Sequence, residues 1–266
     1  MEILSSFFRG ELEFLSVNSM SLSKAKKLEK LPISPSVLII GIPGPSLIGT
    51  LTLTYIIHAL KMEMVGEIDH PDVSNIIFID DGNLAGPIRI YRRGSVYSVI
   101  SDIPIDYIIA QSFAKSIVNF CKKNKVGMIV LLSGLHASEK NVANLKTYGL
   151  VTHESLEKVL YENEIPKFLS GIMTGPDATI LTILKNSSIP TVVLFTECNF
   201  FFPDPEAAIN TIQTVGHILK TEIDITEFRK QIDFLRLQGR QLMEETLSVI
   251  RPEKGQASGP APQIYK

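Results

Sequence analysis

The stretch Val37-Leu-Ile-Ile-Gly-Ile-Pro-Gly-Pro-Ser-Leu-Ile-Gly49 decides the fold. Its first six residues are apolar apart from one glycine, which is typical of a strand buried on both faces. The glycines and prolines that follow predict a tight turn, and a helix is expected from about Ser46 to Leu60. The charge-free segment extends from Val37 to Ile57, but the turn interrupts it. A buried strand, a loop and a helix therefore fit it better than one membrane-spanning helix.

The turn does not have the pattern of a nucleotide-binding loop. Gly41, Gly44 and Gly49 do not follow the dinucleotide fingerprint G-x-G-x-x-G, and the Gly-Lys-Ser/Thr of a P-loop does not occur here. Pro43 and Pro45 also remove backbone N–H groups that a phosphate would need. We therefore expect a structural turn that holds no cofactor.

Strand and helix patterns alternate along the rest of the chain. Arg93-Gly94 joins two predicted strands into a hairpin. Strands that alternate with helices predict an α/β fold with a mostly parallel central sheet. The expected strands are 11–17, 37–42, 65–68, 75–80, 87–92, 95–101, 127–132 and 190–195, and the expected further helices are 106–124, 152–162, 177–185 and 204–219.

Composition excludes several classes of protein. The 266 residues carry a formal net charge of −2, which gives no basic surface for nucleic acid. Two cysteines are too few for a disulfide framework. The start Met1-Glu2-Ile3-Leu4 lacks the basic and apolar regions of a signal peptide. We therefore expect a cytoplasmic protein that binds neither a membrane nor nucleic acid. Its α/β core domain with an N-terminal arm is expected to cover residues 1–223.

Residues 224–251 form a predicted C-terminal helical segment. Eight positions spaced by three and four residues, six of them apolar, follow the pattern of a helix that packs on another helix. Two interpretations remain open: the segment packs on this chain's own core, or it forms a homo-oligomer interface. The second interpretation involves Phe228, Ile232, Leu235 and Leu242.

Residues 252–266 form a predicted flexible tail. The stretch is rich in Pro, Gly, Ala and Ser, a composition that stays extended. Its end, Ile264-Tyr265-Lys266, nevertheless carries a large aliphatic and an aromatic side chain. Either this end is an inert terminus, or it docks into a pocket on another molecule with its free carboxylate.

Candidate catalytic residues are few. Ser133-Gly-Leu-His136 is expected on a loop after a buried strand, where α/β enzymes place their chemistry, and Glu197 ends another strand. Asp80-Asp81-Gly82 either holds a metal or forms a turn. The histidines lack the helical i, i+4 spacing of a zinc site. We therefore expect no metal site and no catalytic residue.

Four segments in a fixed order carry a resemblance to a known family. They are Gly41-Ile-Pro-Gly44 with Gly49, Pro87-Ile-Arg-Ile-Tyr-Arg92, Ser133-Gly-Leu135 and Phe202-Pro-Asp-Pro-Glu-Ala-Ala208. With these segments the chain resembles the proteasome assembly chaperone 2 family, particularly its archaeal homologues. One departure lies at Gly175-Pro-Asp-Ala-Thr179, where relatives carry a helix start richer in leucine. The resemblance implies a three-layer α/β/α fold like that of nucleoside phosphorylases and hydrolases, no catalysis, and homo-oligomers with projecting tails.

Within this resemblance, Ile264-Tyr265-Lys266 matches the hydrophobic–Tyr–any-residue (HbYX) motif at the C-termini of proteasome activators. The resemblance implies that this tripeptide binds pockets between α subunits of the proteasome core particle. The chain would then be an assembly chaperone or an activator that does not use ATP. Two alternatives remain: a hydrolase or phosphorylase-like enzyme that uses Ser133, His136 or Glu197, and a structural oligomer with an inert terminus.

Overall fold

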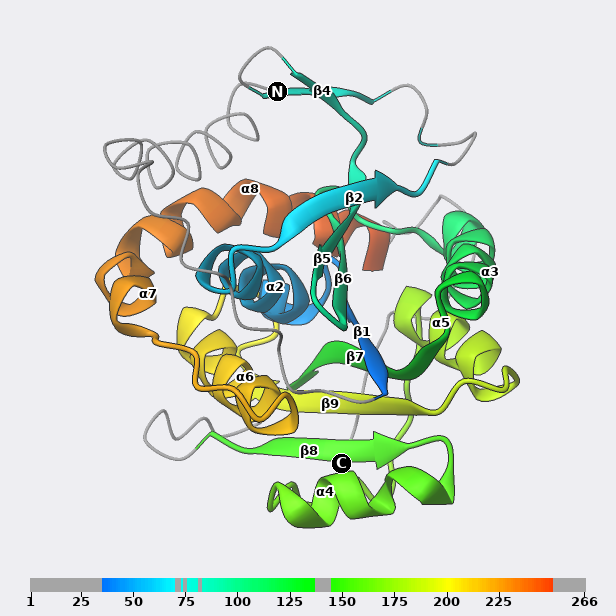
Figure 1. Cartoon of the computed structure of the whole chain (residues 1–266). Helices are drawn as coiled ribbons and strands as arrows, with labels where there is room; N and C mark the ends of the chain where they lie inside the picture. Colours follow the sequence, from blue (N-terminus) through cyan, green and yellow to red (C-terminus); the bar gives the residue numbers. More distant parts are fainter. Residues whose placement is uncertain (1–34, 70–72, 74–75, 81–82, 137–144, 251–266) are drawn as a thin grey trace, which may run out of the picture.

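The computed structural model of the chain describes residues 35–69, 73, 76–80, 83–136 and 145–250, and the structural statements below concern these residues. Their main feature is a sheet of seven strands in the order β2-β5-β6-β1-β7-β9-β8 (Figure 1). Neighbours among β6, β1, β7 and β9 are parallel, whereas β5 and β8 are antiparallel to their neighbours. The predicted mostly parallel sheet is thus confirmed. The strands are β1 (Ser36–Gly41), β2 (Glu63–Glu67), β5 (Ile88–Arg93), β6 (Val96–Ser101), β7 (Val126–His136), β8 (Thr147–Val151) and β9 (Thr191–Cys198).

Helices cover both faces of this sheet and complete the three layers. Helices α2 (Ile48–Ala59) and α6 (Pro205–Ile218) pack together on one face, and α3 (Tyr107–Asn124) and α5 (Pro176–Lys185) pack together on the other (Figure 1). Along β1, alternate side chains enter the two cores, which explains its continuous apolar sequence. The expected α/β/α architecture is confirmed. The remaining elements are η1 (Pro45–Leu47), β3 (Phe78–Asp80), β4 (Asn83–Ala85), η3 (Glu154–Leu156), α4 (Glu157–Glu162), α7 (Thr226–Lys230) and α8 (Ile232–Ile250).

Two helices begin at aspartates that cap them. The carboxylate of Asp106 accepts hydrogen bonds from the N–H groups of Ile108 and Ile109 at the start of α3, at 2.8 and 2.9 Å. Asp204 accepts one from Ala207 N at the start of α6, at 3.2 Å. These bonds satisfy N–H groups that have no partner inside the helix. They fix the first turn of each helix near the carboxyl ends of the parallel strands.

Several predicted elements differ from the structure. Strand β7 continues to His136, so Ser133-Gly-Leu-His136 lies in a strand, and its prediction as a loop was wrong. Strand β8 is not among the predicted strands. Helix α2 begins at Ile48, later than expected, because Ser46 and Leu47 adopt left-handed backbone angles with φ of 56° and 55°. The predicted strand 11–17 lies outside the described residues.

The C-terminal helical segment divides into α7 and α8 at Gln231. The Phe228 ring packs edge-on against Tyr55 of α2, with 4.9 Å between the ring centroids, and Leu242 is buried in the same core. Ile232 and Leu235 are half-buried and pack against it. The segment therefore shares the core that α2 and α6 build, while its predicted role between copies stays a prediction. Within the described part of the chain, no helix is both long and apolar enough to span a bilayer.

The end of β1 and the start of α2 touch through two glycines. A Cβ atom on Gly41 would lie 2.3 Å from the carbonyl oxygen of Gly49, and one on Gly49 would lie 2.9 Å from that of Ile42. Both clashes involve backbone, which a side-chain rotation does not relieve. Only glycine at both positions lets the chain turn from strand to helix within so few residues.

We expect Gly41→Ala to destabilise the protein by about 2–3 kcal/mol, because its methyl group pushes β1 and α2 apart. Urea denaturation followed by circular dichroism measures this change. Gly66→Ala on β2 is the matched control, since a Cβ there meets no atom within 4 Å. Its effect should stay within about 0.5 kcal/mol. Equal losses in both variants would contradict the assigned contact.

Candidate functional site

The connections between the strands place a topological switch point between β1 and β7. At such a point the chain stops adding strands on one side of the first strand and continues on the other side. From β1 the chain passes through α2 to β2, β5 and β6 on one side, and from β6 it passes through α3 to β7 on the other side (Figure 1). In open α/β sheets, ligands bind outside the carboxyl ends of the strands at such a point. Here that position is occupied by the turn 42–47 and the end of β7.

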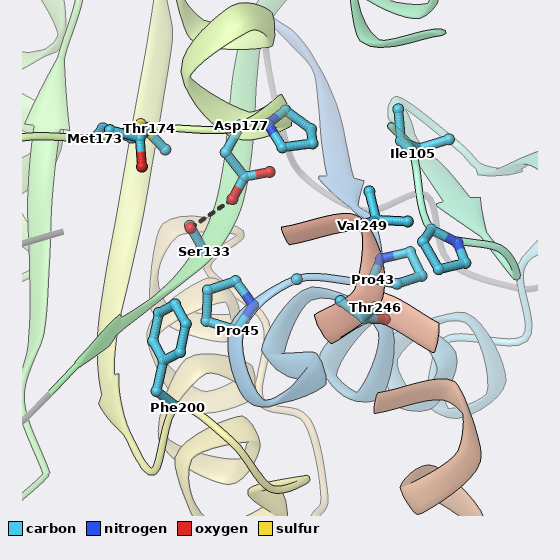
Figure 2. A pocket seen from close by; sticks show the side chains of 13 residues that line it. Pro43, Pro45, Ile105, Ser133, Met173, Thr174, Asp177, Phe200, Thr246 and Val249 are labelled. Carbon is cyan, nitrogen blue, oxygen red and sulfur yellow. Dashed lines mark hydrogen bonds between the residues drawn. The ribbon is translucent and has the colours of Figure 1, made fainter. Parts of the chain in front are cut away.

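A small pocket lies at this switch point (Figure 2). Its open volume is about 20 Å³, which is room for little more than one water molecule. Helix α8 contributes Thr246 and Val249 to the wall of this pocket, so the C-terminal helix covers the carboxyl ends of the central strands here. The other lining residues are Pro43, Gly44, Pro45, Pro104, Ile105, Ser133, Met173, Thr174, Pro176, Asp177 and Phe200.

The turn that fills the crevice is held in place by hydrogen bonds. The Ser46 hydroxyl donates to the carbonyl oxygen of Asn199, and the N–H of Asp204 donates to the carbonyl oxygen of Ser46 at 3.1 Å. Left-handed backbone angles at Ser46 and Leu47 each cost about 1 kcal/mol or more. These hydrogen bonds and the full burial of both side chains offset that cost.

Ser133 and Asp177 form a hydrogen-bonded pair in the wall of the pocket. The Ser133 hydroxyl, at the end of β7, donates to Oδ2 of Asp177 in the first turn of α5, at 2.7 Å. Asp177 is 9% exposed and Ser133 is 3% exposed. Burial raises the pKa of Asp177 to about 6, although the hydrogen bond from Ser133 acts in the opposite direction.

The structure does not bring Ser133, His136 and Glu197 together. Ser133 and His136 are three positions apart on one strand, so their side chains point to opposite faces. The His136 ring packs against Phe200, with 5.8 Å between the ring centroids. Glu197 accepts hydrogen bonds from the Lys146 N–H at 3.2 Å and the Tyr148 hydroxyl at 3.3 Å. Ser133 thus has Asp177 as its partner in place of a histidine base.

The other predicted sites lie partly or wholly outside the described residues. Asp80 ends β3, but Asp81 and Gly82 are not described. Within the described ranges no three His, Cys, Asp or Glu side chains are grouped to hold a metal ion. The docking tripeptide 264–266 lies beyond the last described residue, and its role stays a prediction.

Asp177 is a functional candidate that has no local signal in the sequence. Its position predicts only the start of a helix, within the segment that departs from the family pattern. An aspartate after a proline at a helix start is common for structural reasons. Its partner Ser133 is 44 positions away in the sequence. Only the fold shows that the two side chains meet.

These features define an α/β protein whose switch-point crevice is almost closed. The chain matches the model of the PAC2 family over residues 38–243, and it belongs to that family. It is 22% identical over 234 residues to an uncharacterised protein of Methanocaldococcus jannaschii, a match that covers 88% of this chain and 95% of that protein.

Two solved structures from Pyrococcus furiosus share the fold. PbaA, described as an archaeal homologue of proteasome-assembly chaperone, is 23% identical with a TM-score of 0.76, and the match covers 81% of this chain and 95% of PbaA. PbaB, described as an archaeal proteasome activator, is 21% identical with a TM-score of 0.66, and the match covers 81% of this chain and 96% of PbaB. At these identities the likeness establishes a common fold.

We expect the raised pKa of Asp177 to make stability depend on pH. Because its pKa in the folded state is higher than the ordinary aspartate value of 3.8, the unfolding free energy should fall as pH rises from about 4 to about 6 and then level off. Asp177→Asn removes this part of the pH dependence and is expected to be more stable than wild type by about 2 kcal/mol at pH 7.5. Urea denaturation at pH 4, 5, 6 and 7.5 measures the difference.

Asp233→Asn is the control, because Asp233 lies exposed on α8. It should leave the unfolding free energy within about 0.5 kcal/mol of wild type at each pH. If the gain from Asp177→Asn were the same at pH 4 and pH 7.5, the buried charge would not be its cause.

Proposed function

We propose that this chain is a non-catalytic proteasome-interacting protein of the cytoplasm. It acts as a homo-oligomer that docks Ile264-Tyr265-Lys266 into pockets of the α ring of the core particle, as an assembly chaperone or as an activator that does not use ATP. Membership of the PAC2 family supports the proposal, as does the fold shared with PbaA, an archaeal homologue of proteasome-assembly chaperone, and with PbaB, an archaeal proteasome activator. The observation that carries it is the nearly closed crevice at the switch point.

The size of that crevice argues against turnover of a substrate. Pockets for small-molecule ligands have volumes of roughly 300–1,000 Å³. The open volume here is about 20 Å³, and prolines, Phe200 and α8 fill the rest. Ser133 donates to the carboxylate of Asp177, and no histidine is among the described residues that line the pocket. The fold therefore supports a body that binds through its surface or its tail better than it supports an enzyme.

Helix α8 provides a fixed origin for the tail. Leu242 and Met243 are buried in the core, so the last helix is anchored close to the start of the tail, residues 252–266, which is called the strap below. The fifteen residues 252–266 extend to about 50 Å at most, and a flexible chain of this length spans roughly 20 Å. This reach suits a peptide that enters a pocket on a neighbouring molecule.

The tripeptide has suitable chemistry for docking. A tyrosine gives a large buried area for few rotatable bonds, and its hydroxyl keeps a hydrogen bond. The terminal carboxylate of Lys266 makes a charge-assisted contact with a basic group in the pocket. One tail binds weakly because the strap loses entropy, while several tails on one oligomer bind together with high avidity.

Removal of the tyrosine ring is expected to weaken binding to the core particle by about 30-fold, as loss of an anchor residue does. Surface-binding measurements on immobilised core particle compare wild type, Tyr265→Ala and a truncation after Arg251. Adding one alanine after Lys266 should also weaken binding, because it displaces the carboxylate. Lys266→Ala should bind like wild type, because the motif accepts any final residue.

Tyr161→Ala serves as the matched control, because this exposed tyrosine lies on α4. It should bind like wild type. Unchanged binding in both Tyr265→Ala and the truncation would refute the tail as the docking site. A loss in the truncation alone would move the anchor to another part of the strap.

Ile232 and Leu235 are the residues of the predicted oligomer interface that are best suited to a mutational test. Phe228 and Leu242 are buried in this chain's own core, so their removal unfolds the protein before it tests assembly. The double variant Ile232→Glu, Leu235→Glu should reduce the particle mass in light scattering and weaken core-particle binding by about a hundredfold through lost avidity.

Ile108→Glu, at an exposed position on α3, is the control and should leave the particle mass unchanged. Thermal unfolding of all variants separates loss of assembly from loss of folding. A folded double variant with the mass of wild type would exclude these two residues from the interface.

A further inference from the structure

A buried carboxylate that has no positive partner in the described part of the chain faces the switch-point pocket. Ser133 is the one hydrogen-bond partner of the Asp177 side chain in the described part of the chain, and it donates to Oδ2 at 2.7 Å. The other carboxylate oxygen points away from Ser133, to the side on which Pro43 and Val249 lie (Figure 2). One oxygen of a carboxylate that is nine-tenths buried therefore remains open to a ligand.

Among the described residues that line the pocket, no cationic side chain compensates this charge. Asp177 is the single ionisable residue among the described residues that line the pocket. A second buried aspartate shows the contrast, because Asp102 forms an ion pair with Arg89 at 2.5 Å. Buried charges in proteins are normally paired, since an unpaired charge is costly. Among the described residues, Asp177 thus has the environment of a counter-ion that lacks a charged partner.

The pocket selects a small group by its size. An open volume of about 20 Å³ accepts a head group about as large as water. A primary ammonium group has that size and offers three N–H donors. A guanidinium or quaternary ammonium group is too wide. Pro43, Ile105 and Val249 form an apolar wall that suits a short carbon chain attached to the amine.

We propose that this pocket binds the ammonium group of a small primary amine. Asp177 is the counter-ion, and its free oxygen accepts a hydrogen bond from the ligand. Ser133 positions the carboxylate, and the lone pairs of its hydroxyl accept a second N–H of the ligand. This site uses other residues and other chemistry than the proposed docking tripeptide, and its ligand binding is measured in the absence of the core particle.

The test uses methylammonium chloride as the probe and the full-length chain. Methyl-detected NMR follows Ile105 and Val249 during a titration at pH 7.5 with chloride and ionic strength held constant. We expect saturable shifts of both signals with methylammonium and none with tetramethylammonium, which carries the same charge but is too large. A thermal unfolding series with the same two salts checks the result without isotope labels.

Variants assign the binding to the carboxylate. Asp177→Asn keeps the shape of the side chain and the acceptor for Ser133 but removes the charge, so the saturable shifts should disappear. Ser133→Ala should weaken binding without abolishing it. Asp233→Asn on the exposed face of α8 should bind methylammonium like wild type.

The pH dependence provides a second readout. Since burial raises the pKa of Asp177 to about 6, nearly all of the protein carries the charge at pH 7.5 and about a tenth does at pH 5. The apparent dissociation constant of methylammonium should therefore rise about tenfold between these two pH values. Asp177→Asn should show no binding at either pH.

Three results would overturn the proposal. The first is the absence of saturable shifts in folded wild type. The second is equal binding of tetramethylammonium, which would indicate a general salt effect. The third is unchanged binding in folded Asp177→Asn. None of these outcomes bears on the tail, because the docking assay is read with the core particle and the amine assay without it.

Discussion

The backbone contact between Gly41 and Gly49 is the constraint on which the rest of the structure depends. It holds the end of β1 against the start of α2, so the chain reverses within the seven residues between them. This reversal puts Ser46 and Leu47 into left-handed conformations and places Pro43 and Pro45 over the carboxyl ends of β1 and β7. The tight turn therefore determines where α2 starts relative to β1 and how much of the crevice at the switch point is filled.

Helix α8 depends on the same turn. Its Gly239 passes so close to Pro203 and Leu47 that a Cβ there would lie 2.9 and 3.3 Å from their side chains. This close approach brings Thr246 and Val249 over the pocket, where most α/β enzymes of this topology keep an open crevice. Closure by the chain's own helix leaves little room for a substrate at the switch point, which supports the proposed non-catalytic role. Fold alone does not determine function, and the site has to be argued separately.

The elements that were predicted well are those whose signal is local. β1 has a continuous apolar run, and α3 has a helical period that follows the cap Asp106. β8 was missed because Thr147-Tyr-Gly-Leu-Val151 is short and contains a glycine, and its strand conformation depends on pairing with β9. The end of β7 was missed for the same reason, since Ser133 to His136 pair with Phe195 to Cys198. The contact of Ser133 with Asp177 joins two segments that only the complete sheet brings together.

The two proposed sites are linked by the last turns of α8. Val249 lines the pocket of Asp177, and it precedes the predicted tail, residues 252–266, by only three positions in the sequence. An ammonium group bound as proposed would neutralise the charge beneath this helix and add contacts to Val249, so it would stabilise the packed position of the last turns of α8. In the proposed docking mode, a more firmly packed α8 would raise the effective concentration of the tripeptide at its pocket on the core particle. Binding of the amine and docking of the tripeptide would then share one free energy of coupling, which must be equal in both directions.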